Sequence, residues 1–155
     1  RRSSDLINYE AFRCYDNGNY EGAFQYWKKA AGLGSNEAHH QLSCLYHDGM
    51  GVERDTKKEM HHLEEAAIGG HPEARDNLAG NEGKNGRYER ATKHFIIAAN
   101  LGYDDSLKAV KENFRRGFVS KEDYASALRG HQAAVDAVKS AQRDEAEKAR
   151  REGLF

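Results

Sequence analysis

The sequence predicts an all-α protein, a right-handed α-solenoid of about four stacked helical hairpins. The first observation is a helix ending that occurs three times, as KKAAGLG at 28–34, EEAAIGG at 64–70 and IIAANLG at 96–102. The second is its spacing, because the paired alanines recur after 36 and then 32 residues. Helix–turn–helix units of this period stack on one another, since one hairpin cannot bury its apolar face alone. The third is composition: one proline in 155 residues and abundant alanine favour helix.

The ends of the individual helices are marked by glycines and by residues that open the next helix. Gly34, Gly70 and Gly102 follow the paired alanines, at the place where a residue with positive φ commonly ends a helix. Ser35 and His71 come directly afterwards, and we expect them to precede new helices. The expected helices are 4–15, 20–33, 36–47, 55–69, 72–82, 87–101, 104–116 and 120–150.

The repeat divides the chain into four units and an extension. An aromatic residue near the end of the first helix marks unit one at Tyr15 and unit two at Tyr46. Glu82 stands at the corresponding place in unit three, and we expect weaker packing there. The predicted boundaries are about 4–34, 35–70, 71–102 and 103–135 for the repeat array, and 136–155 for a charged helical extension.

Composition excludes several classes of function. Lys and Arg number 24 against 25 Asp and Glu, so the chain lacks the basic excess of a dedicated nucleic-acid-binding protein. No run of 18 apolar residues is present, and we expect no membrane insertion. Two cysteines in a chain of this length do not make a secreted disulfide framework. We therefore expect an intracellular, reducing compartment, and specifically the cytoplasm.

The second unit carries a family resemblance. It reads NEAHHQLSCLYHDGMGVERDTKKEMHHLEEAAIGG and closely resembles the Sel-one-like repeat, a relative of the tetratricopeptide repeat. The matching residues are Ala38, Leu42, Tyr46, Gly49, Gly51, Val52, Asp55, Lys58, Ala66, Ala67 and Gly70. The resemblance covers roughly residues 5–135, although the turns GNYEGA and GRYERA of units one and three are closer to ordinary tetratricopeptide turns. Ser43 and Ala79 replace a glycine of the family, and His62 and His94 stand where the family prefers a large aromatic residue.

This resemblance implies an adaptor without catalysis of its own, which holds protein partners and needs no cofactor. The partner would be a peptide or a helix in a concave groove. The chain also resembles an expanded algal group of such repeats that often follows a RING-type zinc finger, so substrate recognition for a ubiquitin ligase is one alternative. An RNA-binding helical repeat is a further alternative, because those families share the period.

The inner wall of such a solenoid is lined by the first helix of each hairpin. Aligning these helices on Ala11, Leu42, Leu78 and Val110 predicts which side chains face the groove. The predicted partner-binding residues are Tyr9, Arg13, Asn17, His40, Cys44, His47, Asp76, Lys84, Lys108, Glu112 and Arg115. The alternative interpretation is that these residues are simply the solvated faces of helices.

The sequence gives little support for a metal site or for a catalytic nucleophile. His40, Cys44 and His47 share one helical face, with Asp48 as a fourth donor, but one helix rarely completes a tetrahedral zinc site. Each adjacent histidine pair, 39–40 and 61–62, diverges by about 100° on a helix and cannot converge on one ion. The sequence contains no nucleophile elbow, phosphate loop or dinucleotide fingerprint. We therefore expect no metal and no enzymatic activity.

Overall fold

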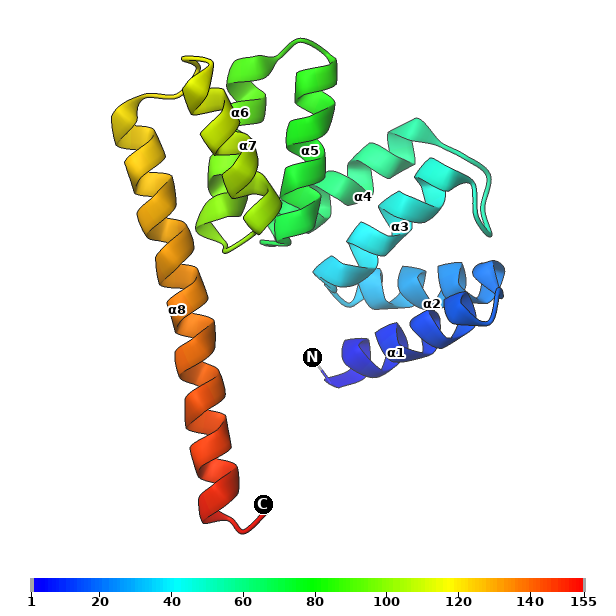
Figure 1. Cartoon of the computed structure of the whole chain (residues 1–155). Helices are drawn as coiled ribbons and strands as arrows, with labels where there is room; N and C mark the ends of the chain where they lie inside the picture. The colour runs from blue at the N-terminus through cyan, green and yellow to red at the C-terminus, as the bar shows by residue number, and fades with distance from the viewer. Residues whose placement is uncertain (1, 155) are drawn as a thin grey trace. The chain divides into compact units, whose positions relative to one another are not determined.

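The computed structural model describes residues 2–154, and within them the chain is all-α (Figure 1). Eight helices and no strand occur in this range. The helices are α1 (Arg2–Asp16), α2 (Tyr20–Gly32), α3 (Asn36–Asp48), α4 (Thr56–Ile68), α5 (Pro72–Lys84), α6 (Tyr88–Asn100), α7 (Asp104–Arg115) and α8 (Lys121–Arg151). Every expected helix is present with both ends within two residues of its predicted place, so the prediction of an all-α chain of helical hairpins is confirmed.

The predicted helix ends have the expected backbone geometry. Gly34, Gly70 and Gly102 have φ angles of 87°, 95° and 90°. The side chain of Ser35 accepts a hydrogen bond from the Ala38 N–H at 3.1 Å and caps α3. The chain therefore turns sharply after each pair of alanines, and the next helix starts four residues after the preceding one ends.

The chain forms two compact units, one ending at Asn81 and the other beginning at Glu82, and we describe each by itself. The first contains the hairpins α1–α2 and α3–α4 and most of α5. Its centre is Trp27, which is fully buried and meets Phe12 edge to face with ring centroids 5.1 Å apart. Phe24 of α2 meets Tyr46 of α3 in the same way, at 5.7 Å. Aromatic edges thus join α1 to α2 and α2 to α3.

Paired alanines allow the close approach of the helices. Ala30, Ala66 and Ala67 are fully buried in the first unit, and Ala98 and Ala99 are fully buried in the second. A methyl group is the largest side chain that fits where the second helix of a hairpin meets its neighbours. The recurrence of these alanines therefore has a packing cause and needs no chemical one.

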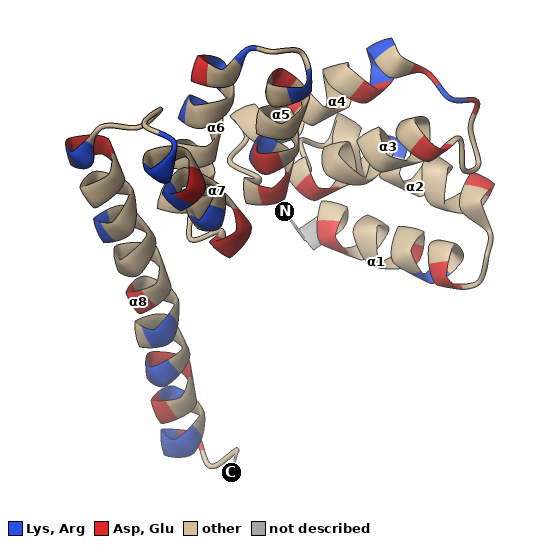
Figure 2. Cartoon of the chain, turned by 45° about the horizontal axis from the view of Figure 1, so that its top comes forward, with Lys and Arg blue, Asp and Glu red and all other residues tan. Residues whose placement is uncertain are grey.

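The second unit is built from the end of α5 with α6, α7 and α8. Val110 and Ala127 are fully buried between its helices, and Tyr124 lies parallel to Phe114 with ring centroids 4.5 Å apart. Helix α8 runs on past α6 and α7 (Figure 1), and every residue from Asp136 to Lys148 is exposed. Basic and acidic residues follow one another along this part of α8 (Figure 2). Helix α8 is continuous across the predicted boundary at 135/136.

Glycine substitutions test the turn geometry. Gly70 has a φ of 95° with open space around a Cβ, so Gly70→Ala suffers backbone strain alone. We expect it to lower the free energy of unfolding by about 1–2 kcal/mol. Gly80, inside α5, also has open space, and the matched change Gly80→Ala should raise stability by about 0.5–1 kcal/mol. Urea denaturation of both variants measures these changes, and two effects of the same sign would contradict the assigned geometry.

Candidate functional site

The predicted partner-binding residues of α1 lie on one exposed face. Tyr9, Arg13 and Asn17 are spaced by four residues, and all three are exposed. Arg13 pairs with Glu10 at 3.6 Å on the same helix. A hydrogen bond of 2.9 Å from Asn8 Nδ2 to Ser35 Oγ joins α1 to the cap of α3. The exposed α1 face therefore lies in the same unit as α3.

The α3 residues divide between the surface and the core. His47 is exposed, and its Nδ1 lies 2.9 Å from the Glu59 carboxylate of α4. Cys44 is half-buried. His40 is only 3% exposed because His71, just before α5, covers its ring. A buried ring cannot contact a partner, so His40 does not belong to the predicted surface.

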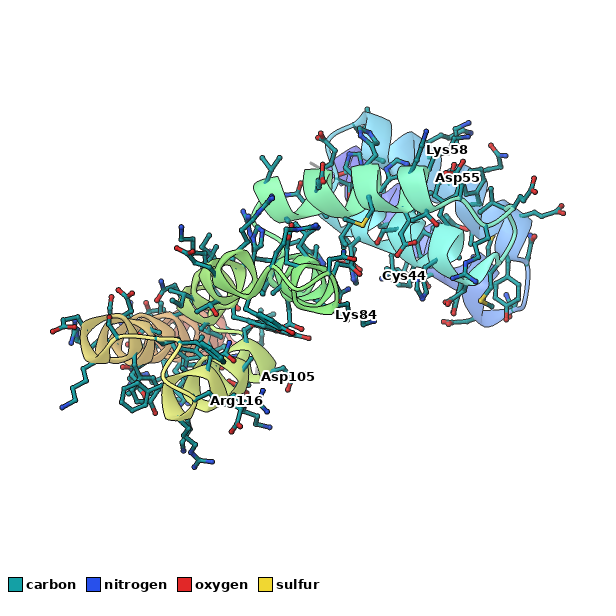
Figure 3. All side chains as sticks on the ribbon, turned by 90° about the horizontal axis from the view of Figure 1, so that it is seen from above. Cys44, Asp55, Lys58, Lys84, Asp105 and Arg116 are labelled. Carbon is teal, nitrogen blue, oxygen red and sulfur yellow. The ribbon has the colours of Figure 1, made fainter. Side chains whose placement is uncertain are left out.

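The remaining predicted residues lie on α5 and α7. Asp76 is half-buried in the first unit, and Lys84 is exposed in the second; Figure 3 labels Cys44 and Lys84. Lys108, Glu112 and Arg115 form an exposed row on α7, within which Glu112 pairs with Arg115 at 3.8 Å. Each unit thus presents an exposed polar row along a first helix, and the grouping of these rows into one groove stays a prediction.

A polar cluster lies where α3 meets the start of α5. His71 accepts a hydrogen bond at Nδ1 from the Ala74 N–H at 3.2 Å and so caps α5. Its other nitrogen, Nε2, must then carry the proton, which it donates to the Glu37 carboxylate at 2.7 Å. One histidine therefore both starts α5 and ties it to α3. This hydrogen bond is the main cause that lowers the pKa of Glu37 to about 2.

The same cluster brings together three groups that can ligate metals, Glu37, His40 and His71, with ligand atoms within 4.8 Å of one another. The arrangement does not fit an ion. The rings of His40 and His71 lie face to face, 4.4 Å apart at 27°, whereas a nitrogen lone pair points along its own ring plane. Both His71 nitrogens are already engaged, so metal binding would break the cap of α5 or the bond to Glu37. This cluster is best described as a structural junction.

The buried histidine and the cysteine do not form an activated nucleophile. Cys44 Sγ lies 3.9 Å from His40 Nε2, which is within reach of a weak sulfur hydrogen bond. Burial raises the pKa of the Cys44 thiol and lowers the pKa of His40. Both groups are therefore neutral near pH 7, whereas a reactive cysteine needs its thiolate form. His40 Nδ1 is buried without a hydrogen-bond partner, an arrangement that costs free energy.

A second histidine contact was not foreseen from the sequence. Nδ1 of His39 on α3 lies 2.9 Å from Nδ1 of His62 on α4, so the two rings share one proton. His62 also lies parallel to Tyr46, with ring centroids 5.7 Å apart. Burial is the main cause that lowers the pKa of His62 to about 4, and the neighbouring His39 contributes. The signal in the sequence was that His62 occupies a position where the family prefers an aromatic ring.

Comparisons with known proteins support the fold. No family profile and no curated protein sequence matches this chain. Among solved structures, the Sel1 repeat protein from Oxalobacter formigenes superposes with a TM-score of 0.68 over 86% of this chain, at 22% identity. The protective antigen c5321 of uropathogenic Escherichia coli, which displays an SLR fold, superposes with a TM-score of 0.68 over 84%, at 23% identity. This chain has the fold of the Sel1-type repeat.

The Sel1-type fold confirms the predicted class, a helical-repeat solenoid. The chain spans 58% of the length of the first of these structures and 30% of the second. Structures at this level of identity establish the fold and leave the partner open. None of the helices described in residues 2–154 has the length and apolar character needed to cross a membrane.

The His39–His62 contact predicts a dependence of stability on pH. Because the folded pKa of His62 is about 4 against an ordinary 6.5, the unfolded chain binds more protons between these values. Stability therefore rises with pH from 4 to 6.5, and His62→Phe should remove about 1–2 kcal/mol of this rise, allowing for solvent screening. Urea denaturation at pH 4, 5, 6 and 7 measures the effect. The control His61→Phe changes an exposed neighbour that meets the His62 ring edge on and is only a minor cause of its lowered pKa, so its effect should be smaller. An equal effect there would contradict the assignment.

The Glu37–His71 contact predicts a second change at lower pH. The folded pKa of Glu37, about 2, lies below its ordinary 4.5, so its contribution to stability is present above pH 4.5 and lost as the pH falls toward 2. Glu37→Gln should flatten the stability curve within this window. Thermal unfolding followed by circular dichroism between pH 2 and 5 measures the change. Glu64→Gln, at an exposed position on α4, should leave the curve unaltered.

Proposed function

We propose that this chain is a non-catalytic interaction scaffold that binds a segment of a protein partner on the exposed faces of its first helices. The observation that carries this proposal is the fold itself. Stacked helical hairpins present long, rigid rows of side chains, and repeat proteins use such surfaces for binding. The burial of His40 and the neutral state of both His40 and the half-buried Cys44 support a role without catalysis.

The composition of the α1 face suits a protein partner. Tyr9 is 61% exposed, and Arg13 lies one turn away from it. Tyrosine and arginine are the residues most often found at the energetic centre of protein interfaces. His47 and Glu59 add a polar pair on the adjoining hairpin. The surface therefore offers one aromatic anchor within a mixed-charge rim, which fits a peptide or helix carrying both signs of charge.

Substrate recognition within a RING-type ubiquitin ligase is a more specific form of this proposal. It rests on the resemblance to repeat proteins that follow RING fingers. It requires a RING finger elsewhere on the same polypeptide or on a bound subunit.

Affinity purification with surface variants tests the scaffold function. We expect the triple variant Tyr9→Ala, Arg13→Glu and His47→Ala to reduce recovery of a specific partner by roughly tenfold or more, because hot-spot residues each contribute over about 1 kcal/mol. The measurement is quantitative mass spectrometry of proteins co-purified from the native source. The control is the double variant Lys57→Ala with Glu64→Ala, which alters two exposed residues of α4, the second helix of its hairpin. Equal recovery with the triple variant and the control would contradict the proposal.

A further inference from the structure

Two aromatic side chains of the second unit lie together on its surface. Tyr88 at the start of α6 is 62% exposed, and Phe118 in the loop before α8 is 59% exposed. Their rings are parallel to within 8°, with centroids 6.3 Å apart. Exposed aromatic surface that adjoins a hollow is a common feature of binding sites.

The repeat explains why Tyr88 is exposed. In the first hairpin the equivalent residue, Tyr20, meets Tyr15 edge to face at 5.1 Å. Glu82 takes the place of that second aromatic residue in the third hairpin. Its carboxylate turns to the guanidinium groups of Arg87 and Arg90, the latter at 3.4 Å. No aromatic ring of α5 therefore packs against Tyr88, and a hollow adjoins its side chain.

Two hollows share the wall formed by Tyr88, Thr92 and Phe118. The larger, of about 420 Å³, is lined by apolar groups that include Ala91 and Phe95, and we call it the Arg116 hollow. The smaller, of about 230 Å³, is lined by Ile96 and Val119 among others, and we call it the Asp123 hollow. Because they share these three lining residues, the two hollows adjoin at an aromatic wall, and we call the pair the groove.

The two hollows carry opposite charge. Arg116 is the one charged residue that lines the larger hollow; it caps the C-terminal end of α7 and is labelled in Figure 3. Its Nε–H donates to Glu112 at 3.2 Å, and a guanidinium carries four further N–H donors. Three charged residues line the smaller hollow, and two of them, Lys93 and Glu89, form an ion pair at 3.8 Å. The third, Asp123, gives this hollow a net negative charge. The groove is thus cationic at one end and anionic at the other.

We propose that this groove binds an extended peptide segment of a partner protein, in which an acidic residue and a basic residue flank an aromatic or large aliphatic one. The apolar side chain lies against Phe95 in the Arg116 hollow, the acidic residue pairs with Arg116, and the basic residue pairs with Asp123. Charge at the two ends sets the direction of the peptide. This inference rests on the proposed scaffold function but assigns it a second surface, separate from the α1 and α3 faces.

A peptide library supplies the probe. A phage-displayed library of random dodecapeptides is selected on the complete wild-type chain, after depletion on the Gly83→Leu variant. Gly83 lines the Arg116 hollow, and a Cβ there would meet only the Ala91 methyl, at 4.0 Å. Leucine therefore grows into the hollow without backbone strain, and it also favours the helix. We expect the enriched peptides to share the acidic–apolar–basic pattern.

Binding of the enriched sequence, as a fluorescein-labelled synthetic peptide, is then measured by fluorescence anisotropy. Gly83→Leu and Arg116→Ala should each weaken binding by roughly tenfold or more, the loss that follows from removing one good contact. Arg115→Ala is the matched control, because Arg115 also pairs with Glu112 but does not line the hollow. It should change the affinity less than twofold. Circular dichroism confirms that each variant is folded, and Phe118→Ser provides a second, independent disruption.

Two results would overturn the inference. One is a selection in which no peptide prefers the wild-type chain over Gly83→Leu, or in which the preferred peptides lack the pattern. The other is an equal loss of affinity for Arg115→Ala and Arg116→Ala. Neither result would contradict the scaffold proposal. That proposal is tested separately, by recovery of a partner from the native source with the triple variant of α1 and α3.

Discussion

The close approach of helices at the paired alanines is the constraint on which the rest of the structure depends. Ala30, Ala66 and Ala98 are fully buried, and each stands one turn before a glycine with positive φ. A larger side chain at these places would force the helices apart, at a cost of about 1–3 kcal/mol. Within the first unit the hairpin α1–α2 packs on α3–α4 through α2 and α3, and within the second unit α8 packs on α6 and α7.

Histidines take over structural roles that aromatic or capping residues usually have. His71 caps a helix and reaches back to Glu37, while His62 stands where an aromatic ring would lie against Tyr46. These replacements preserve the shape of the hairpins, since an imidazole ring is flat and can stack. They also make the packing sensitive to protons, because a buried imidazole must stay neutral. His62 and His71 of this region therefore have roles in packing and capping.

One repeated position carries an aromatic residue in the first unit and a glutamate in the second, and the two residues have different consequences. In the first unit Tyr15 and Tyr20 fill the end of their hairpin with apolar contact. In the second unit Glu82 turns to arginines and leaves a hollow beside Tyr88. The same architecture thus yields a well-filled core in one place and an open, aromatic-walled groove in another. Departures from a repeat pattern point to sites of function, because the regular positions are already committed to packing.

The sequence by itself determined the helices, their ends and the repeat, because these depend on local preferences: alanine at close contacts, glycine at positive φ, and a cap after each turn. It also identified the exposed row of Tyr9 and Arg13 on α1. Only the tertiary structure showed that His40 is buried by His71 and that His39 meets His62. Only the tertiary structure showed that Tyr88 and Phe118 lie side by side. Such contacts join residues about 20 to 30 positions apart, and their existence depends on how neighbouring helices are rotated, which no local preference encodes.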